Sequence, residues 1–273
     1  MVKKVIMKSY LGLILLFMYL PIVVLIAFSF NKSKSRGNWT GFTFKWYEEL
    51  FRNSQIKDAL YNTIIIALLS SVIAVVIGTL AAIGIHSMKK AKKTAVMNLT
   101  YLPVLNPDIV TGVSLMLMFV FIGTFVKMQM GFFTMLLAHV TFNIPYVILS
   151  VLPKLKQMNT NLYEAALDLG ASSSYALRKV IIPEIMPGIV SGFLMAITLS
   201  IDDFVISYFT TGSGVSNLSI TIYSMARTGV KPTINALSTL MFGGVLLLLF
   251  IINIRSDREA KKRKSIKTDG MEV

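Results

Sequence analysis

EAALDLGASSSYALRKVIIPEIMPG, residues 164–188, is a segment with charged residues, glycine and proline that lies between two long apolar runs. It belongs to a connection over residues 153–186, whereas neighbouring helices of a bundle are usually joined by only a few residues. The length and composition of this connection predict that it has a task beyond joining two helices.

Two short helices are predicted inside the connection. The first covers Leu162–Leu169, because Asn159, Thr160 and Asn161 offer capping oxygens before it and Gly170 favours the left-handed conformation that ends a helix. The second runs from the serines at 172–174 toward Pro183. The first helix would present an apolar face with small residues, suited to close packing on another protein, formed by Leu162, Ala165, Ala166 and Leu169.

The rest of the chain has the composition of an integral membrane protein. Of its 273 residues 55% are apolar and only 15% are charged, and the mean hydropathy is +0.69, which is too apolar for a soluble domain of this length. Because a helix of about 20 residues crosses the hydrocarbon core, the apolar runs predict an all-α fold with six spans. The spans are expected near residues 10–30, 60–85, 105–126, 131–152, 187–209 and 234–254.

The distribution of basic residues predicts how these spans are oriented. If both termini are cytoplasmic, the cytoplasmic segments contain 18 of the 27 Lys and Arg residues, as the positive-inside rule requires. The net charge of +14 is therefore interpreted as a signal for topology and for contact with membrane lipid, and no nucleic acid partner is predicted. The residues on the cytoplasmic side are Lys3, Lys4, Lys8, Lys89, Lys90, Lys92, Lys93, Lys154, Lys156, Arg178, Lys179, Arg255, Arg258, Lys261, Lys262, Arg263, Lys264 and Lys267.

On the opposite side, residues 31–59 form a long external segment. Phe44, Tyr47, Leu50 and Phe51 recur at helical spacing within it, which predicts a short amphipathic helix on the outer surface. This helix would anchor the chain in the lipid interface or provide a docking surface for an external partner.

The motif in the opening segment resembles that of a known family. Glu164-Ala165-Ala166, three residues, Gly170, nine residues and then Val180-Ile181-Ile182-Pro183 are similar to the EAA loop of ABC importer permeases, E-A-A-x3-G-x9-I-x-L-P. Val180 and Ile182 depart from the pattern without a change of polarity.

The resemblance implies a six-helix permease of the ABC type I importer (MetI-like) fold over residues 10–254, between a cytoplasmic segment at 1–9 and a basic cytoplasmic tail at 255–273. In that family the loop couples a cytoplasmic ATPase to the membrane helices. By this resemblance Glu164 and Gly170 shape the coupling helix, Ala165 and Ala166 allow close docking, and Pro183 closes the motif.

Further stretches resemble the second permease subunits of spermidine/putrescine transport systems. They are Phe42–Tyr47, Asn106–Val110, Leu167–Pro187 and Leu199–Phe204. The resemblance implies a polyamine importer in a bacterial cell membrane. Its partners would be a homologous second permease subunit, an ABC ATPase dimer that binds ATP and Mg²⁺, and an extracytoplasmic polyamine-binding protein.

Three acidic residues lie in the predicted spans and are candidates for the substrate pathway. An Asp at the centre of a spanning helix costs about 2.5–3.5 kcal/mol, so such residues are kept mainly for a cavity, a partner or a helix end. Asp108, Asp202 and Asp203 would attract an organic cation, and Phe204 and Tyr208 offer aromatic faces for cation–π contact.

Each of these acids also has a structural interpretation. Asp108 follows Asn106-Pro107 and would complement the dipole of its own helix. Asp202 and Asp203 would lie about 100° apart on one helix, so that only one of them faces the pathway. His139 is interpreted as a hydrogen-bonded residue of the bundle.

The chain lacks the motifs of an enzyme. No G-x4-G-K-[ST] sequence for binding nucleotide phosphates occurs, there is no Cys, and no cluster of metal ligands is apparent, so we expect no cofactor and no catalytic residue on this chain. Two alternatives remain at this stage: a permease for another small solute, and a stand-alone cation channel or proton-coupled transporter.

Overall fold

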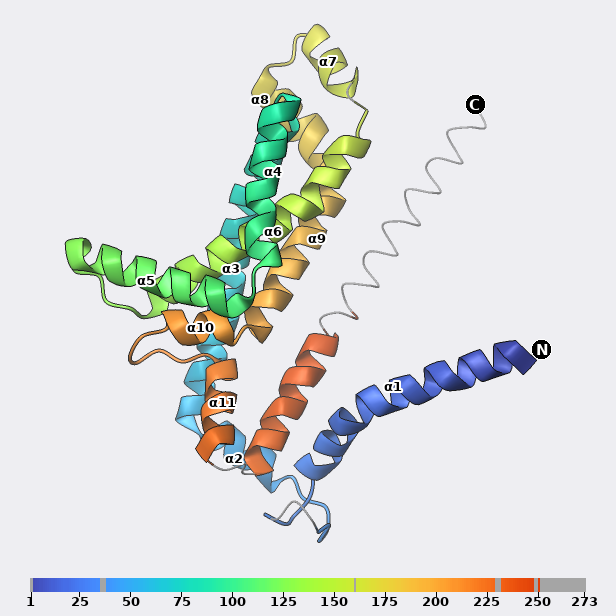
Figure 1. Cartoon of the computed structure of the whole chain (residues 1–273), viewed down its shortest axis with the longest axis vertical. Coiled ribbons are helices and arrows are strands. Elements are labelled where there is room, and N and C mark those ends of the chain that lie inside the picture. Colours follow the sequence, from blue (N-terminus) through green and yellow to red (C-terminus); the bar gives the residue numbers. More distant parts are fainter. Residues whose placement is uncertain (1, 35–37, 160, 229–231, 248–249, 251–273) are drawn as a thin grey trace. The chain divides into compact units, whose positions relative to one another are not determined.

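The computed structural model describes residues 2–34, 38–159, 161–228, 232–247 and 250, without the side chains of residues 2–5 (Figure 1). The basic tail at 255–273 and Thr160, for which predictions were made, lie outside these residues. Within the described part, secondary structure consists of helices and one isolated antiparallel bridge, Asn31–Phe42, which confirms the all-α prediction. The chain divides into two compact units, Met1–Asp58 with Thr221–Arg255, and Ala59–Ile220 with Ser256–Val273.

The first unit contains α1 (Val2–Ser29), α2 (Lys45–Arg52) and an apolar helix over Pro232–Leu247. The predicted amphipathic helix is confirmed as α2, whose Trp46 and Leu50 are buried while Phe51 is exposed. The Trp46 Nε1–H group donates to the backbone oxygen of Asn31 at 2.7 Å. This bond fixes α2 to the turn that follows α1.

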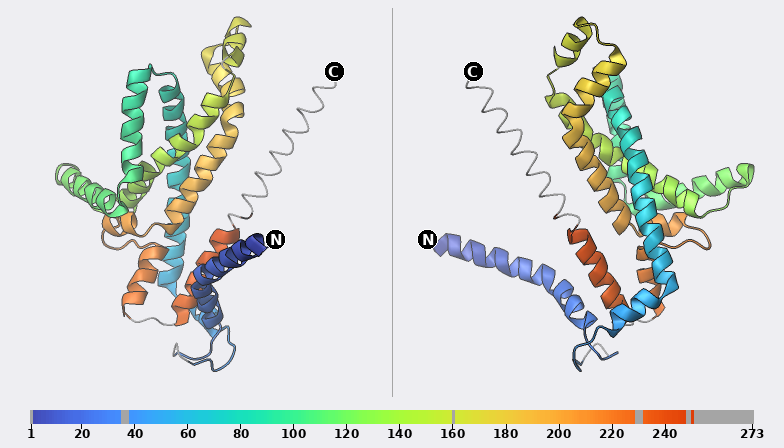
Figure 2. Two further views of the ribbon diagram at one scale, coloured as in Figure 1. Left: turned by 45° about the vertical axis from the view of Figure 1, so that its right-hand side comes forward. Right: turned by 180° about the vertical axis from the view of Figure 1, so that it is seen from behind.

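The second unit holds most of the bundle (Figures 1 and 2). Close packing of its helices depends on glycines: a Cβ atom on Gly78 of α3 would lie 2.8 Å from Val147 of α6, and one on Gly188 of α9 would lie 2.9 Å from the backbone oxygen of Ser150. Helix α6 is thus in close contact with both α3 and α9. The helices of this unit are α3 (Ser54–His86, whose first residues belong to the other unit), α4 (Lys90–Leu105), α5 (Asp108–Val126), α6 (Phe132–Gln157), α7 (Asn161–Asp168), α8 (Ser173–Ala176), the π-helix η1 (Leu177–Ile181), α9 (Ile182–Asp202) and α10 (Val205–Thr210). Helix α11 (Leu218–Thr228) begins in this unit, and its residues from Thr221 on belong to the first unit.

Each of the six predicted spans contains an apolar helix. Five helices are long and apolar enough to cross a membrane, and Pro232–Leu247 is a shorter one. The five are Ile6–Ser29, Ser54–His86, Asp108–Val126, Phe132–Gln157 and Ser173–Asp202.

Two of the predicted boundaries were wrong. The span expected at 187–209 is interrupted, because α9 ends at Asp202 and α10 begins at Val205. The connection expected before residue 105 is largely helical and forms α4. Helix α4 ends at Leu105, because Pro107 disfavours the helical conformation of Asn106, which is extended. Helix α5 then runs in a different direction (Figure 1).

Candidate functional site

The predicted coupling segment begins with α7, which ends as expected at Gly170. Gly170 has φ +85°, its N–H donates to the Leu167 oxygen at 2.9 Å, and the Ala171 N–H donates to the Ala166 oxygen at 3.0 Å. These two bonds form a Schellman motif, which satisfies carbonyls at the helix end and requires a left-handed residue. Glycine is the residue that adopts this conformation at least cost.

Helix α7 is exposed on its apolar side. Leu162 and Leu169 are 47% and 89% exposed, and Ala165 lies on the same face. Ala166 is half-buried on the inner side, and Tyr163 packs against the core of the second unit. The outer face of α7 is therefore formed by Leu162, Ala165 and Leu169. The sequence also predicted Ala166 on this face, and that part of the prediction was wrong.

A continuous helix leads from this segment into the bundle. Ser172 caps its start, because the Ser172 hydroxyl accepts a bond from the Tyr175 N–H at 3.3 Å. Pro183 has no N–H to donate to the Lys179 oxygen, and the chain forms a π-turn just before it, where the Ile182 N–H reaches the Leu177 oxygen. The helix then continues to Asp202, a length of about 45 Å at 1.5 Å per residue.

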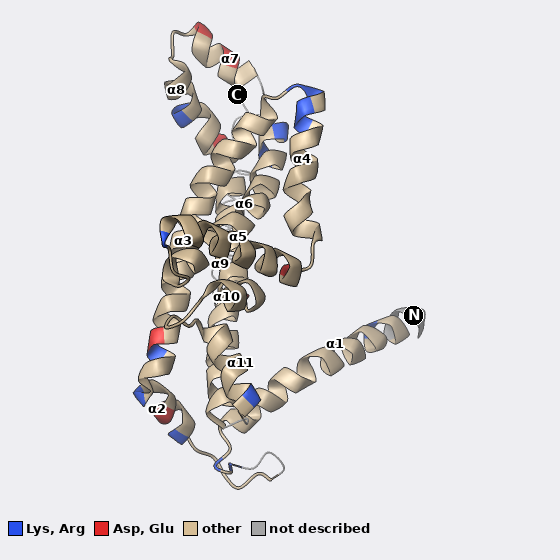
Figure 3. Ribbon diagram, turned by 60° about the vertical axis from the view of Figure 1, so that its left-hand side comes forward, with Lys and Arg blue, Asp and Glu red and all other residues tan. Residues whose placement is uncertain are grey.

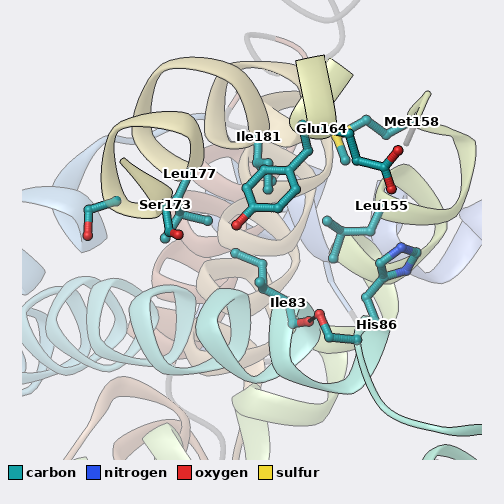
Figure 4. Close-up of a pocket in the computed structure, with 11 residues that line it drawn as sticks. Ile83, His86, Leu155, Met158, Glu164, Ser173, Leu177 and Ile181 are labelled. Carbon is teal, nitrogen blue, oxygen red and sulfur yellow. Dashed lines mark hydrogen bonds between the residues drawn. The ribbon is translucent and has the colours of Figure 1, made fainter. Parts of the chain in front are cut away.

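A pocket of about 450 Å³ lies between α7 and the ends of α3 and α6 (Figure 4). Ile83 and Leu177 give it apolar walls, and His86 and Glu164 contribute polar groups. At the same end, the Lys93 ammonium donates to the His86 backbone oxygen at 3.2 Å and so caps α3. Lys and Arg residues lie at the start of α4 and in η1, directly after α8 (Figure 3).

The other end of the long helix is a bend at Asp203, which is not helical (ψ 124°). The Asp203 carboxylate accepts bonds from the Ile206 N–H at 3.1 Å, the Ser207 N–H at 2.7 Å and the Ser207 hydroxyl at 2.7 Å. Asp203 therefore caps α10, and its side chain is only 8% exposed. The expectation that Asp202 and Asp203 are neighbours on one helix was wrong, because the helix ends between them.

A buried polar network surrounds this bend. His139 of α6 contacts the Ser200 hydroxyl of α9 through Nδ1 at 3.0 Å and the Ser207 hydroxyl through Nε2 at 2.9 Å. The Asn143 amide nitrogen donates to Ser200 at 2.9 Å, and the Asn217 amide nitrogen donates to Ser207 at 2.8 Å. The interpretation of His139 as a hydrogen-bonded bundle residue is confirmed, with partners that sequence reasoning did not connect to it.

The signal for this network was present in the sequence but was weak. His139 and Asn143 are spaced i, i+4 in an otherwise apolar helix, which places them on one face. Ser200, Asp203 and Ser207 have a similar spacing. Pairing the two groups required knowing that α6 packs along α9, which no local pattern reveals.

The remaining candidate acids are exposed. Asp202 is the last residue of α9 and forms no hydrogen bond or ion pair with any residue that the structure describes. Phe204 and Tyr208 follow it, with ring centroids 5.5 Å apart, and Tyr208 is 48% exposed. The bend thus brings one unpaired carboxylate and two aromatic rings close together in the chain.

Asp108 lies in the first turn of α5 and is exposed. The N-cap position of this helix is Pro107, and Asn106 is the C-cap of α4. One turn further along, a Cβ on Gly112 would lie 3.0 Å from the Phe209 ring, so α5 packs directly on α10. Asp108 shares the Gly112 face of α5, the face that packs on α10. Among the described residues no group of three or more metal-ligating side chains occurs.

Comparison with known proteins assigns the class to which this fold and coupling segment belong. Residues 74–261 match the family described as "Binding-protein-dependent transport system inner membrane component". The match covers more than half of the chain, and the chain therefore belongs to this family of multi-pass membrane permeases.

Individual relatives are more specific. The chain is 37% identical over 245 residues to the spermidine/putrescine transport system permease protein PotC of Haemophilus influenzae, covering 90% of this chain and 93% of that protein. It is 36% identical over 250 residues to the putrescine transport system permease protein PotI of Escherichia coli K12, covering 90% and 89%.

Solved structures share the fold at lower identity. A chain of a bacterial alginate ABC transporter in complex with an alginate-bound periplasmic protein matches with a TM-score of 0.73 and 18% identity, covering 95% of both chains. A chain of the MetNI methionine ABC transporter matches with a TM-score of 0.60 and 20% identity, covering 80% of this chain and 99% of that one. The fold is that of ABC importer permeases, as the sequence predicted.

Proposed function

We propose that the chain is a permease subunit of an ATP-driven importer of polyamines such as spermidine and putrescine. The observation that carries this proposal is the 37% identity to PotC across 90% of the chain. The relationship to PotI, whose name specifies putrescine, supports the same class of substrate.

The source of energy lies on other chains in this proposal. The sequence has no nucleotide-binding motif, so ATP and Mg²⁺ are bound by a partner ATPase dimer, and this chain acts as a transport subunit rather than an enzyme. A homologous second permease completes the pathway, and an extracytoplasmic binding protein delivers the substrate.

The outer face of α7 supports the proposed contact with the ATPase. Leu169 and Leu162 are exposed on α7, which lies at the same end of the second unit as the basic residues at the start of α4, and an exposed apolar face next to polar residues is typical of a protein interface. Glu164, Ala165, Ala166 and Gly170 shape this docking helix. Pro183 lies within the long helix, directly after the π-turn of η1.

Movement of α7 would reach the substrate pathway through this helix. Because Ser173–Asp202 is continuous and α6 packs closely along it, displacement at the coupling end is transmitted to the bend at Asp203. The bundle then alternates between access from outside and access from the cytoplasm.

The chemistry at the bend suits an organic cation. Asp202 offers a carboxylate without a protein partner among the described residues, and Phe204 and Tyr208 offer aromatic faces. Asp108 provides a second carboxylate on the helix that packs against α10. Asp203 is assigned a supporting role, because its oxygens already accept three hydrogen bonds.

The proposed location is a bacterial cell membrane with both termini in the cytoplasm. This orientation puts α7 and the lysines at the start of α4 on the side of the ATPase, in agreement with the positive-inside rule.

The proposal is tested by ATPase activity of the complete complex in lipid nanodiscs. Addition of the binding protein with spermidine or putrescine should raise the rate of hydrolysis, whereas the binding protein with an amino acid or a sugar should not. If only another solute stimulated ATP hydrolysis, the polyamine assignment would be wrong, but the assignment as an ATP-driven importer would stand. Solute flux through this chain without an ATPase would instead favour a stand-alone channel.

A further inference from the structure

The hydrogen bonds around His139 have directions that follow from counting protons. The Ser207 hydroxyl has one proton, which it donates to the Asp203 carboxylate at 2.7 Å. Its oxygen must therefore accept from both of its other contacts, the Asn217 amide nitrogen at 2.8 Å and His139 Nε2 at 2.9 Å. A proton on His139 Nε2 is required by this arrangement.

The other ring nitrogen completes the chain in the neutral form of the imidazole. With Nε2 protonated, Nδ1 is an acceptor, and the Ser200 hydroxyl donates a hydrogen bond to it at 3.0 Å. The Ser200 oxygen in turn accepts from the Asn143 amide nitrogen at 2.9 Å and lies 3.1 Å from the Ser70 hydroxyl. The bonds therefore run in one direction, from Asn143 through Ser200, His139 and Ser207 to Asp203.

This chain joins separate elements at the point where the long helix ends. Ser70 is on α3, His139 and Asn143 are on α6, Ser200 is on α9 and Ser207 is on α10. His139 is 1% exposed, and a buried polar group in a membrane protein has no water to replace a lost partner. The side chain of His139 thus fixes α10 and the Asp203 cap relative to α6.

We propose that His139 is a positioning residue for transport, which acts through Ser207 and Asp203 to hold the bend from which the Asp202 carboxylate is presented to a cationic substrate. This inference rests on the proposed function, because it assigns Asp202 to substrate binding. His139 itself does not touch the substrate.

The experiment uses the complete complex in proteoliposomes and measures initial uptake of spermidine over a range of concentrations. His139→Leu removes both hydrogen bonds, whereas His139→Gln keeps an acceptor toward Ser200 and a donor toward Ser207, as in the neutral imidazole. Thr141→Val is the matched control on α6, because the Thr141 hydroxyl is exposed and bonds only to the Leu137 oxygen. The amount of assembled complex is determined for every variant.

We expect His139→Leu to raise the apparent KM about tenfold, as the loss of one or two buried hydrogen bonds implies, with assembly unchanged. His139→Gln should restore KM to within about threefold of the wild type, and Thr141→Val should match the wild type. If His139→Leu does not assemble, Ser207→Ala tests the same link, since it removes the hydroxyl between His139 and Asp203 and should also raise KM.

A double variant separates positioning from a general loss of stability. Asp202→Asn alone should raise KM, and adding His139→Leu or Ser207→Ala to it should have little further effect, because the positioned carboxylate is already absent. The inference would be overturned if the effects on KM multiplied in the double variants, or if KM were unchanged in the single variants. It would also be overturned if His139→Gln raised KM as much as His139→Leu. A wild-type complex that takes up no spermidine would contradict the proposed function itself. The comparison of KM between variants and wild type tests only the role of His139.

Discussion

At the scale of single residues, Asp202 and Asp203 are adjacent in sequence and have different surroundings. The Asp203 carboxylate accepts hydrogen bonds from two backbone N–H groups and a hydroxyl, while Asp202 is exposed at the end of α9. The difference arises because the backbone leaves the helix at Asp203, which turns its side chain onto α10. The bend is thus supported by Asp203, and in the proposed function the exposed Asp202 carboxylate provides the charge for a substrate.

This separation predicts different consequences for substitutions at the two positions. Asp203→Ala should lower the thermal stability of the purified complex, because loss of a capping carboxylate costs about 0.5–2 kcal/mol. Asp202→Asn should leave stability unchanged and weaken polyamine uptake. Differential scanning fluorimetry together with uptake assays distinguishes the two, and equal loss of stability in both variants would contradict the assignment.

The sequence was sufficient to predict Gly170 but not Asp203. The helix end at Gly170 depends on local backbone conformation, so a glycine after an amphipathic stretch indicates it reliably. The role of Asp203 depends on Ser207 and on His139, which is more than sixty residues away in the chain. Until such partners are known, an Asp within an apolar run can be either a residue that lines a substrate pathway or a residue that caps a helix.

At the scale of helices, α6 and α9 behave as one packed pair. Gly188 and Gly192 allow α9 to approach α6 so closely that a Cβ on Gly192 would lie 3.3 Å from the Val147 Cα atom. In the proposed mechanism, this close packing would let a displacement at α7 reach the bend with little side-chain rearrangement.

Substitution of these glycines provides a test of the packing. Gly188→Ala should destabilise the chain by about 1–3 kcal/mol, because its Cβ would meet the Ser150 oxygen and the Lys154 side chain at under 3 Å. Gly84→Ala on α3 is the control, since no atom lies within 4 Å of the place that its Cβ would occupy and alanine favours a helix. Thermal unfolding in detergent should show a lower midpoint for the first variant only.

The exposed face of α7 gives a second prediction for an element. Leu169→Glu should reduce co-purification of the ATPase by about tenfold or more, because it puts a charge into an apolar contact. Asp168→Asn, the adjacent exposed position, should have little effect. Normal ATPase binding by the Leu169 variant would mean that another surface holds the ATPase.

Sequence patterns found some helices and missed others for physical reasons. Helix α2 was predicted because its aromatic residues recur at helical spacing beside polar ones. Helix α4 was missed because it begins with several lysines and is only moderately apolar, and it was therefore assigned to a cytoplasmic connection. The bend between α4 and α5 was not anticipated, although Pro107 is the residue that causes it.

At the scale of the whole molecule, the chain is a multi-pass permease of the binding-protein-dependent transport family. Family membership, the ABC permease fold and the coupling segment agree on this organisation. Helix α7 lies at one end of the long helix and Asp202 at the other, and we propose that the first receives force from the ATPase and the second contacts substrate. Similar permeases carry other solutes, so the substrate is decided by the pathway rather than by the fold.

The central claim is that this chain carries polyamines inward when ATP is hydrolysed by a partner. The most direct measurement is uptake of radiolabelled spermidine into proteoliposomes that contain the complete complex, with ATP on the side of α7 and the binding protein on the other. Spermidine uptake is expected to require ATP, the ATPase and this chain, and unlabelled putrescine should inhibit it. Uptake that continues without ATP or ATPase, or no uptake of spermidine by an assembled complex with an active ATPase, would contradict it.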